Sequence, residues 1–263
     1  MPKAEASDIR RWLGWLALVV AFSIACVFLS NWQFGRRQEA VGAMSRLDTN
    51  YNSAPAPLES LEKPWGYHPV NEWRPVTLTG HYLPGNALLV RNRPLNGSSG
   101  FLEVVPFQLK SGIIALVERG WVSSDSNYAA PKTFGLPSAD EQTVVARIRE
   151  QEPAFAGTVP LGQIASINVD KFVEAAKIKD RVFGHVYLRM ASESKPQGLL
   201  TPLSKPNLDE GNHLSYALQW ILFAVMAVFA LFWAIRKERQ ARAGIVKVRR
   251  KDSDSQFEDG LLS

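Results

Sequence analysis

The sequence predicts a membrane protein in which two transmembrane helices flank an external α+β domain with a mostly antiparallel sheet or small barrel. Two apolar runs, residues 12–29 and 214–235, lie near the ends of the 263-residue chain. The second run holds 22 residues without a charge, and at about 1.5 Å per residue it can cross about 30 Å of hydrocarbon. Between the runs the composition is that of a soluble domain, with short segments in which apolar and polar residues alternate.

The first apolar run follows Arg10 and Arg11, so it has to be distinguished from a signal peptide. Its 18 residues exceed a usual signal core, and no small-x-small cleavage site follows it. We therefore expect residues 1–11 to precede an uncleaved transmembrane helix over 12–34. The single cysteine, Cys26, lies within this run, which excludes an intrachain disulfide and a Cys-x-x-Cys site.

Charge predicts how the chain crosses the membrane. Residues 236–251 hold eight Lys or Arg against one acid, whereas the whole chain has a net charge of +5. By the positive-inside rule this cluster is cytoplasmic. We therefore expect two spans in the cell membrane (the second over 214–235), both termini in the cytoplasm and residues 35–213 outside it. The tail 236–263 is expected to be disordered. A basic tail beside a span indicates topology and contact with the lipid bilayer, so no nucleic-acid partner is expected.

The external segment is predicted to begin with a helical continuation over residues 37–50 and a Pro-rich extended linker over 53–69. A short helix is expected over 168–179, because its apolar residues recur on one face. Residues 123–141 are polar with Pro and Gly, so we expect a long surface loop there, and residues 196–207 are expected to form another loop that leads into the second span.

Alternation between apolar and polar residues predicts the strands of the domain. They are expected at 74–82, 87–91, 101–109, 113–121, 143–149 and 181–190. The turn Lys110-Ser111-Gly112 favours a hairpin between two of them, and Gly80 is a candidate bulge. Strands with a single helix and no repeat are typical of the α+β class.

Polar and aromatic side chains gather where the second span begins. His213, Tyr216 and Trp220 share one helical stripe with Ala217, a pattern that a helix serving only as an anchor does not need. The alternatives are an aromatic belt at the membrane surface, and helix packing or function. The first span ends in a similar group, Trp32, Gln33, Arg36 and Arg37. If the two helices pack, the groups meet; otherwise each is an independent interfacial anchor.

The external segment contains no pattern typical of a soluble active site. Its histidines form no i, i+4 metal pair, and neither a phosphate loop nor a nucleophile elbow is present. His81 and His185 lie in predicted strands, where edge or hydrogen-bonded core positions are expected. Glu118 and Arg119 are adjacent in a strand, so their side chains should face opposite sides. We therefore expect a protein that is not an enzyme.

Five groups of residues occur in a fixed order along the chain. They are Trp32-Gln33-x-x-Arg36, Arg74-Pro75-Val76 with Gly80-x-Tyr82, Asn92-Arg93 with Gly100, Leu116-Val117-x-Arg119-Gly120-Trp121-Val122, and Asn212-His213-Leu214-x-Tyr216-Ala217-x-Gln219-Trp220. With a span at each end, this order resembles the SURF1 family, integral membrane proteins of cytochrome c oxidase biogenesis. The chain departs from the family pattern at Gly211, where many members have Asn.

The resemblance implies a role in maturation of the haem-copper oxidase, with oxidase subunits and haem-synthesis enzymes of the membrane as partners. Bacterial members are similar to chaperones that present haem a to the main oxidase subunit. The iron ligand proposed for the family maps onto His213. Tyr216 and Trp220 would then flank the porphyrin, and Arg36 and Arg119 would receive its propionates.

Two other classes of protein stay open at this point. A structural assembly scaffold would hold oxidase subunits without binding haem, with His213 and Trp220 as helix–helix contacts. A membrane sensor would bind a ligand in its external domain, residues 37–210. For the domain itself we expect Arg119 and Trp121 on one face of a strand, pointing toward its membrane-side surface.

Overall fold

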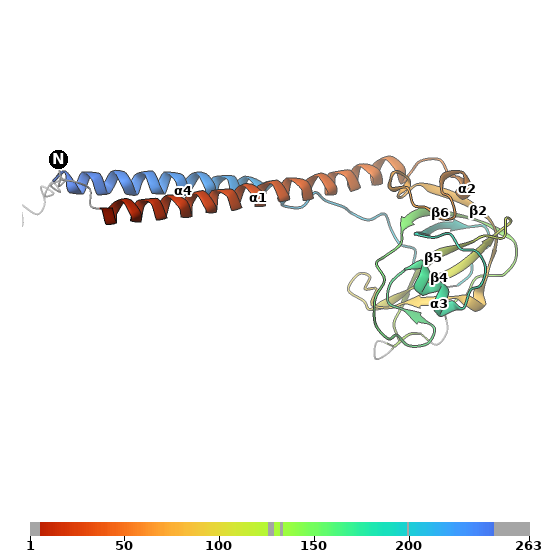
Figure 1. The fold of residues 1–263 in the computed structure, drawn as a ribbon. Helices are drawn as coiled ribbons and strands as arrows, with labels where there is room; N and C mark the ends of the chain where they lie inside the picture. The colour runs from red at the N-terminus through yellow and green to blue at the C-terminus, as the bar shows by residue number, and fades with distance from the viewer. Residues whose placement is uncertain (1–5, 126–128, 132–133, 199, 245–263) are drawn as a thin grey trace, which may run out of the picture. The chain divides into compact units, whose positions relative to one another are not determined.

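The computed structural model describes residues 6–125, 129–131, 134–198 and 200–244. The chain divides into two compact units, one helical and one rich in β-strands (Figure 1). The helical unit joins the residues up to 40 to those from 210 onward, and the other unit is Val41–Asp209. The predicted tail beyond residue 244 and parts of the predicted loop 123–141 lie outside the described residues.

Both predicted spans are helical. Helix α1 runs without a break over Ala6–Asn50, so the span and its polar continuation form one helix of 45 residues, as expected. Helix α4 covers His213–Arg242, and both helices are long and apolar enough to cross a membrane. Gly211, with a φ of 63°, turns the chain just before α4. Asn212 is the N-cap residue of α4, but its side chain makes no capping hydrogen bond.

Helices α1 and α4 lie side by side and run in opposite directions (Figure 1). Along α4 the less exposed residues recur after steps of four and three, at His213, Ala217, Trp220, Ala224, Ala227 and Leu231. The same steps occur in α1 at Val19, Ser23, Cys26, Ser30, Gln33 and Arg37. We call these two stripes the seam. Its small Ser, Cys and Ala residues allow the two backbones to approach closely.

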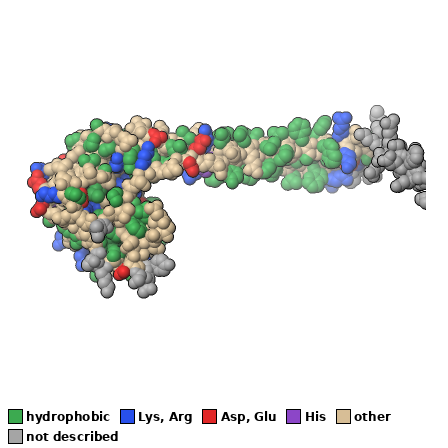
Figure 2. Space-filling model, turned by 180° about the vertical axis from the view of Figure 1, so that it is seen from behind, with side chains coloured by type: hydrophobic (Ala, Val, Ile, Leu, Met, Phe, Trp, Pro, Cys, Tyr) green, Lys and Arg blue, Asp and Glu red, His purple; other side chains and the backbone are tan. Residues whose placement is uncertain are grey.

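An ion pair between the two helices lies at each end of the seam. Arg11 pairs with Glu238 at 2.6 Å, and Arg37 pairs with Glu210 at 2.9 Å. Away from the seam, the two helices present a long apolar surface with Lys and Arg gathered near one end (Figure 2). This distribution suits a bilayer, in which apolar side chains face lipid and charges lie at the edge.

The second unit is built on one sheet of eight strands. In pairing order they are β1 (Ala56–Pro57), β2 (Pro75–Tyr82), β6 (Gln142–Glu150), β8 (Val186–Glu193), β5 (Ile114–Ser123), β4 (Gly100–Leu109), β3 (Leu88–Val90) and β7 (Gln163–Ile164). Four pairs of neighbours are antiparallel, and β1–β2, β5–β8 and β3–β7 are parallel. A further antiparallel pairing joins β2 to β4, so five strands form a closed circuit of hydrogen-bonded pairs. The α+β domain with a mostly antiparallel sheet is therefore confirmed.

The predicted strands agree closely with the observed ones. Strands β4 and β5 form the expected hairpin around residues 110–112. Strand β8 begins later than predicted, because His185 has a φ of 63° and interrupts the extended conformation. Gly80 is not a bulge. It pairs with a residue on each side, and a Cβ there would lie 1.9 Å from the carbonyl oxygen of Gln108.

The segment predicted as an extended linker is part of the folded domain. It contains β1, helix α2 (Leu58–Leu61) and a 3-10 turn over Pro69–Asn71, and Leu58 is buried in the core. Glu62 is also buried, and its Oε1 accepts from Asn71 Nδ2 at 3.0 Å. Because Leu58 is buried and the Glu62 carboxylate is hydrogen-bonded, this Pro-rich segment packs against the rest of the domain.

Apolar side chains form two main core clusters on the two faces of the sheet. One includes Val105, Phe107, Val117 and Leu188, and the other includes Leu116, Trp121, Phe172 and Tyr187. Helix α3 (Val169–Ala176) covers the second cluster with Phe172. It forms as predicted, with the Asn168 side chain accepting from Lys171 N at its start.

Candidate functional site

His213 meets Gln33 at one end of the helix pair. His213 is the first residue of α4, Gln33 belongs to the α1 half of the seam, and His213 Nδ1 lies 2.8 Å from Gln33 Oε1. One turn further along α1, Arg37 forms its ion pair with Glu210. The two polar groups that we predicted to meet if the helices pack therefore do meet.

The hydrogen bond determines which nitrogen of His213 is free to act. An amide oxygen only accepts hydrogen bonds, so Nδ1 is the donor to Gln33. In a neutral imidazole the other nitrogen, Nε2, then keeps its lone pair. Histidines that bind metals commonly donate their second ring N–H to an oxygen acceptor in this way. The pair therefore has the arrangement that a metal-ligating histidine and its supporting acceptor commonly show.

The residues of the predicted stripe on α4 lie in two different environments, the seam and the exposed flank of the helix pair. Ala217 is fully buried in the seam, and Trp220 is half-buried there with its ring edge-on to Phe223 at 5.8 Å between centroids. Tyr216 is 50% exposed, on the flank of the helix pair. Trp220 therefore takes part in helix packing, whereas the phenol ring of Tyr216 is accessible.

Arg36 lies on the same flank as Tyr216. Arg36 follows Gln33 by three residues in α1, and Tyr216 follows His213 by three residues in α4. In two antiparallel helices that face each other at Gln33 and His213, this step turns both side chains to the same side of the pair. Arg36 pairs with Glu39 at 2.6 Å, but 54% of its side chain is exposed. An exposed ion pair is weak, so the Arg36 guanidinium is available to another anion.

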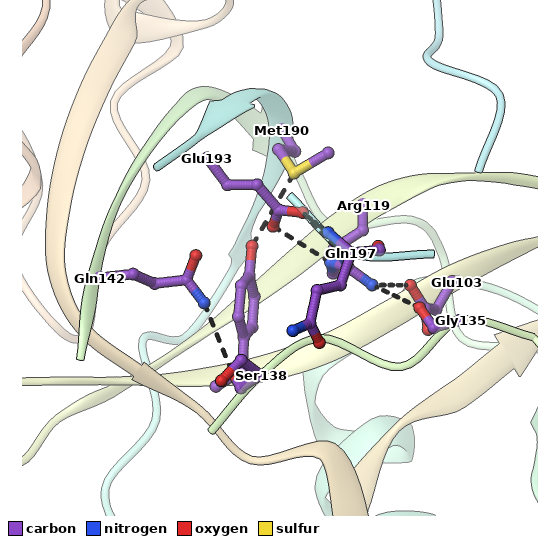
Figure 3. Close-up of polar contacts among 9 residues, drawn as sticks. Glu103, Arg119, Gly135, Ser138, Gln142, Met190, Glu193 and Gln197 are labelled. Atoms are coloured by element: carbon purple, nitrogen blue, oxygen red, sulfur yellow. Dashed lines mark hydrogen bonds and ion pairs between the residues drawn. The ribbon is translucent and has the colours of Figure 1, made fainter. Parts of the chain in front are cut away.

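Arg119 lies in the interior of the β-rich unit (Figure 3). It donates to Glu103 Oε2 at 2.6 Å and to both carboxylate oxygens of Glu193, at 2.8 and 3.3 Å. Its two other N–H groups donate to the carbonyl oxygens of Gly135 and Gln197. All five N–H donors of the guanidinium are used in this way. Arg119 therefore links two strands and two loops, and has no donor left for an external propionate.

The two predicted loops both contact this guanidinium. The described residues of 123–141 and 196–207 are irregular and mostly exposed or half-buried, and the carbonyl oxygens of Gly135 and Gln197 accept from Arg119. The loops also touch each other, because a Cβ on Gly135 would lie 2.0 Å from the Cα of Gly198. The turn-forming composition correctly predicted irregular structure there, but it did not indicate that the two loops contact Arg119 and each other.

A β-bulge in β5 places Arg119 and Trp121 on different faces of the strand. Gly120 and Glu118 pair with consecutive residues of β4, so Arg119 is an extra residue in β5. Val117 and Trp121 would face the same side in a regular strand, but they belong to different core clusters. The Arg119 guanidinium lies over the Tyr82 ring, in the cluster of Val117. The prediction that Arg119 and Trp121 share a face is therefore wrong.

A second bulge brings Glu193 to Arg119. Ser192 and Met190 pair with consecutive residues of β6, so Ala191 is an extra residue in β8. The bulge turns Glu193 to the face on which Met190 packs, where the regular alternation would have turned it away. No sequence pattern marks such a bulge, which is why Glu193 was not among the predicted residues.

The buried cluster has two carboxylates for one guanidinium. Burial raises the pKa of Glu103 to about 7, although the charge of Arg119 and its hydrogen bond lower it. Burial also raises the pKa of the Tyr82 phenol. A proton on Glu103 balances the cluster, because Arg119 and Glu193 then neutralise each other.

Glu118 belongs to a separate ion pair on the opposite face of β5. Its Oε2 accepts from Arg189 Nε at 2.9 Å, and burial raises its pKa. The prediction that Glu118 and Arg119 face opposite sides is confirmed. His81 lies half-buried in β2, as expected, whereas His185 precedes β8 with a φ of 63° and is exposed beside Gln151. Within the described residues, no three His, Cys, Asp or Glu side chains gather as metal ligands would.

The fold and the His213 site together define a class: a membrane protein with two antiparallel spans, a β-rich domain between them, and one histidine at the meeting point of the spans. The SURF1 family model matches residues 20–225. The chain therefore belongs to the SURF1 family.

Relatives extend over most of the chain. A SURF1-like protein of Mycobacterium bovis is 34% identical in an alignment of 245 positions that covers 88% of each chain. The cytochrome oxidase assembly protein SHY1 of Saccharomyces cerevisiae is 30% identical in an alignment of 145 positions that covers 51% of this chain and 35% of the yeast protein. A SURF1-like protein of Dictyostelium discoideum is 24% identical in an alignment of 199 positions that covers 63% of this chain and 73% of the relative.

Proposed function

We propose that this protein is a non-catalytic assembly factor for cytochrome c oxidase. Support comes from its membership of the SURF1 family and from its similarity to a yeast protein whose name describes oxidase assembly. Its partners are then oxidase subunits and the enzymes of haem synthesis in the same membrane. The proposal includes the predicted topology, with both termini in the cytoplasm and the β-rich domain outside the cell membrane.

We further propose that the protein binds haem a at the outer end of the helix pair, with His213 as the iron ligand. The observation that carries this proposal is the hydrogen bond from His213 Nδ1 to Gln33, which leaves Nε2 with a lone pair. Haem a supplies an iron that takes an axial imidazole, and its porphyrin is flat and largely apolar. The flank beside His213, at the edge of an apolar helix pair, suits a group of that kind.

Three other side chains take roles around the porphyrin. Tyr216 is accessible beside His213 and supplies an aromatic wall, and the half-buried Trp220 supports it from the seam. Arg36 lies on the Tyr216 flank and pairs with a propionate. Arg119 is left out of the site, because its donors are all used inside the domain.

The competing proposal is a scaffold that holds oxidase subunits without haem. The same contacts favour it, because His213, Ala217 and Trp220 all lie in the seam and hold α4 to α1. The two proposals differ in one measurable property, which is whether the purified protein carries a pigment.

The test is the absorption spectrum of the full-length protein purified from cells that make haem a. Haem binding predicts a Soret band that is lost or shifted in His213→Ala, while the amount of inserted protein stays normal. Oxidase activity should fall without vanishing, because Arg36, Tyr216 and Trp220 still contact the porphyrin. Asn212→Ala is the matched control, since its side chain makes no capping bond and its neighbour is His213. Full haem content with an unchanged spectrum in His213→Ala would exclude His213 as the iron ligand, and wild-type protein without a pigment would favour the scaffold.

A further inference from the structure

Gln33 is the one side chain of α1 that the structure hydrogen-bonds to His213 among the described residues. Its place is set by the helix pair. Gln33 belongs to the seam between Ser30, which is buried, and Arg37, which is paired with Glu210. Both partners of the hydrogen bond are half-buried, so their positions are limited by packing on each side.

A carboxamide suits this position for a chemical reason. A neutral imidazole exists as two tautomers, and an oxygen acceptor at Nδ1 selects the one with the proton on Nδ1. The Gln33 oxygen can make that selection without bringing a charge to the bilayer edge, where an unpaired carboxylate is costly. Hydrogen bonding at Nδ1 also makes Nε2 a stronger electron donor.

We propose that Gln33 is a positioning residue for haem iron, which holds the His213 ring with Nε2 as the coordinating nitrogen and sets its donor strength. This inference rests on the proposed haem site. It adds that the ligand is built by both spans: α4 carries the nitrogen and α1 fixes its tautomer. The site therefore exists only when α1 and α4 are packed together, and Arg37–Glu210 one turn away helps to hold them so.

The first test needs no haem. In full-length apo-protein labelled with 15N at histidine, NMR correlations distinguish the two tautomers of His213. We expect the wild type to show the proton on Nδ1, and Gln33→Leu to lose that preference while α1 stays helical. Gln38→Leu is the matched control, because Gln38 is an exposed residue of the same helix. A Gln33→Leu protein that keeps the wild-type tautomer would overturn the proposal.

The second test measures haem a binding and the midpoint potential of the bound iron. Supporting partners of metal ligands commonly change affinity by about 10- to 100-fold, so Gln33→Leu should weaken haem a binding by that factor. Gln33→Glu keeps an acceptor at Nδ1 and should bind haem a, with a lower midpoint potential because a carboxylate makes the imidazole a stronger donor to ferric iron. Gln38→Leu should match the wild type in both measurements.

The outcomes separate the two proposals. Wild-type protein that takes up no haem a would overturn the haem site and, with it, the role of Gln33. Wild-type protein that binds haem a, with affinity and potential unchanged in Gln33→Leu and Gln33→Glu, would overturn the role of Gln33 alone. A purely structural role would lower the amount of both variants and leave the potential of Gln33→Glu at the wild-type value.

Discussion

Arg119 donates every N–H of its guanidinium within the β-rich unit, and its two carboxylate partners are as deeply buried as it is. Replacing it with methionine keeps most of its volume but leaves Glu103 and Glu193 without their counter-ion. Breaking a buried ion pair from one side costs about 3–5 kcal/mol. We expect Arg119→Met to lower the free energy of unfolding of the full-length protein by that amount, measured by denaturant titration in detergent.

Arg36→Met provides the comparison for this measurement. Its ion pair with Glu39 is largely exposed, and such pairs contribute about 0–1 kcal/mol. If Arg119→Met were as stable as Arg36→Met, the buried cluster would not be a stabilising link. If Arg119→Met is unstable, as expected, any loss of oxidase maturation in it would be a consequence of misfolding rather than evidence of haem contact.

The raised pKa of Glu103 predicts that the free energy of unfolding depends on pH. Its pKa is raised from 4.5 to about 7 in the folded protein, because burial disfavours the carboxylate. The folded state therefore binds a proton more tightly than the unfolded state does. The stabilisation from this group is full below pH 4.5 and is lost as the pH rises through about 7. We expect the free energy of unfolding to fall over that range, and to fall less steeply in Glu103→Gln.

The comparison with Glu103→Gln is informative because glutamine resembles the protonated acid. A residual slope is expected, since burial raises the pKa of Glu118 as well and acts in the same direction. Equal slopes for wild type and Glu103→Gln would mean that Glu103 does not titrate in this range.

At the scale of single elements, β2 depends on a glycine. At Gly80, β2 pairs with β4 on one side and with β6 on the other. A Cβ at this position would lie 1.9 Å from the Gln108 carbonyl oxygen. Because that atom belongs to the backbone of β4, it cannot move aside easily. We expect Gly80→Ala to destabilise the protein by about 1–3 kcal/mol, measured by thermal or denaturant unfolding.

Gly85→Ala is the matched control for this effect. Nothing lies within 4 Å of a Cβ built there, so the change should be within about 0.5 kcal/mol. A Gly80→Ala variant as stable as Gly85→Ala would show that β2 and β4 are not held as closely as the geometry requires.

The elements also show how far the sequence predicts this structure. Alternation located β2 and β6, in which about every second side chain is fully buried, whereas β4 and β5 are buried on both faces. The polar groups around Gln33 and His213 were predicted to meet if the helices pack, since both end a span on the same side. Arg119 was harder, because its separation from Trp121 and its pairing with Glu193 depend on two extra residues in β5 and β8. A bulge changes the face of every later residue without leaving a compositional trace.

At the scale of the whole molecule, the chain passes from one span through the β-rich unit to the other. The residues of the hydrogen bond between the spans, Gln33 and His213, are 180 positions apart. That contact can form only after the entire intervening unit has been made and both spans are inserted. A haem site built at this contact would therefore be absent from a protein that lacks either span.

The distribution of Lys and Arg predicts the orientation of the helix pair in the membrane. The basic cluster of residues 236–251, which begins in the last turns of α4, should lie in the cytoplasm and the β-rich unit outside it, because moving many Lys and Arg across the bilayer is disfavoured. Cysteines introduced at Ser111, in the exposed β4–β5 turn, and at Ala243, just after α4, report on the two sides. The natural cysteine, Cys26, is 1% exposed within the seam and should not react. A membrane-impermeant maleimide should label Ser111→Cys in intact cells and Ala243→Cys only after permeabilisation. The opposite pattern would place the β-rich unit, and the outer end of the helix pair with His213, on the cytoplasmic side.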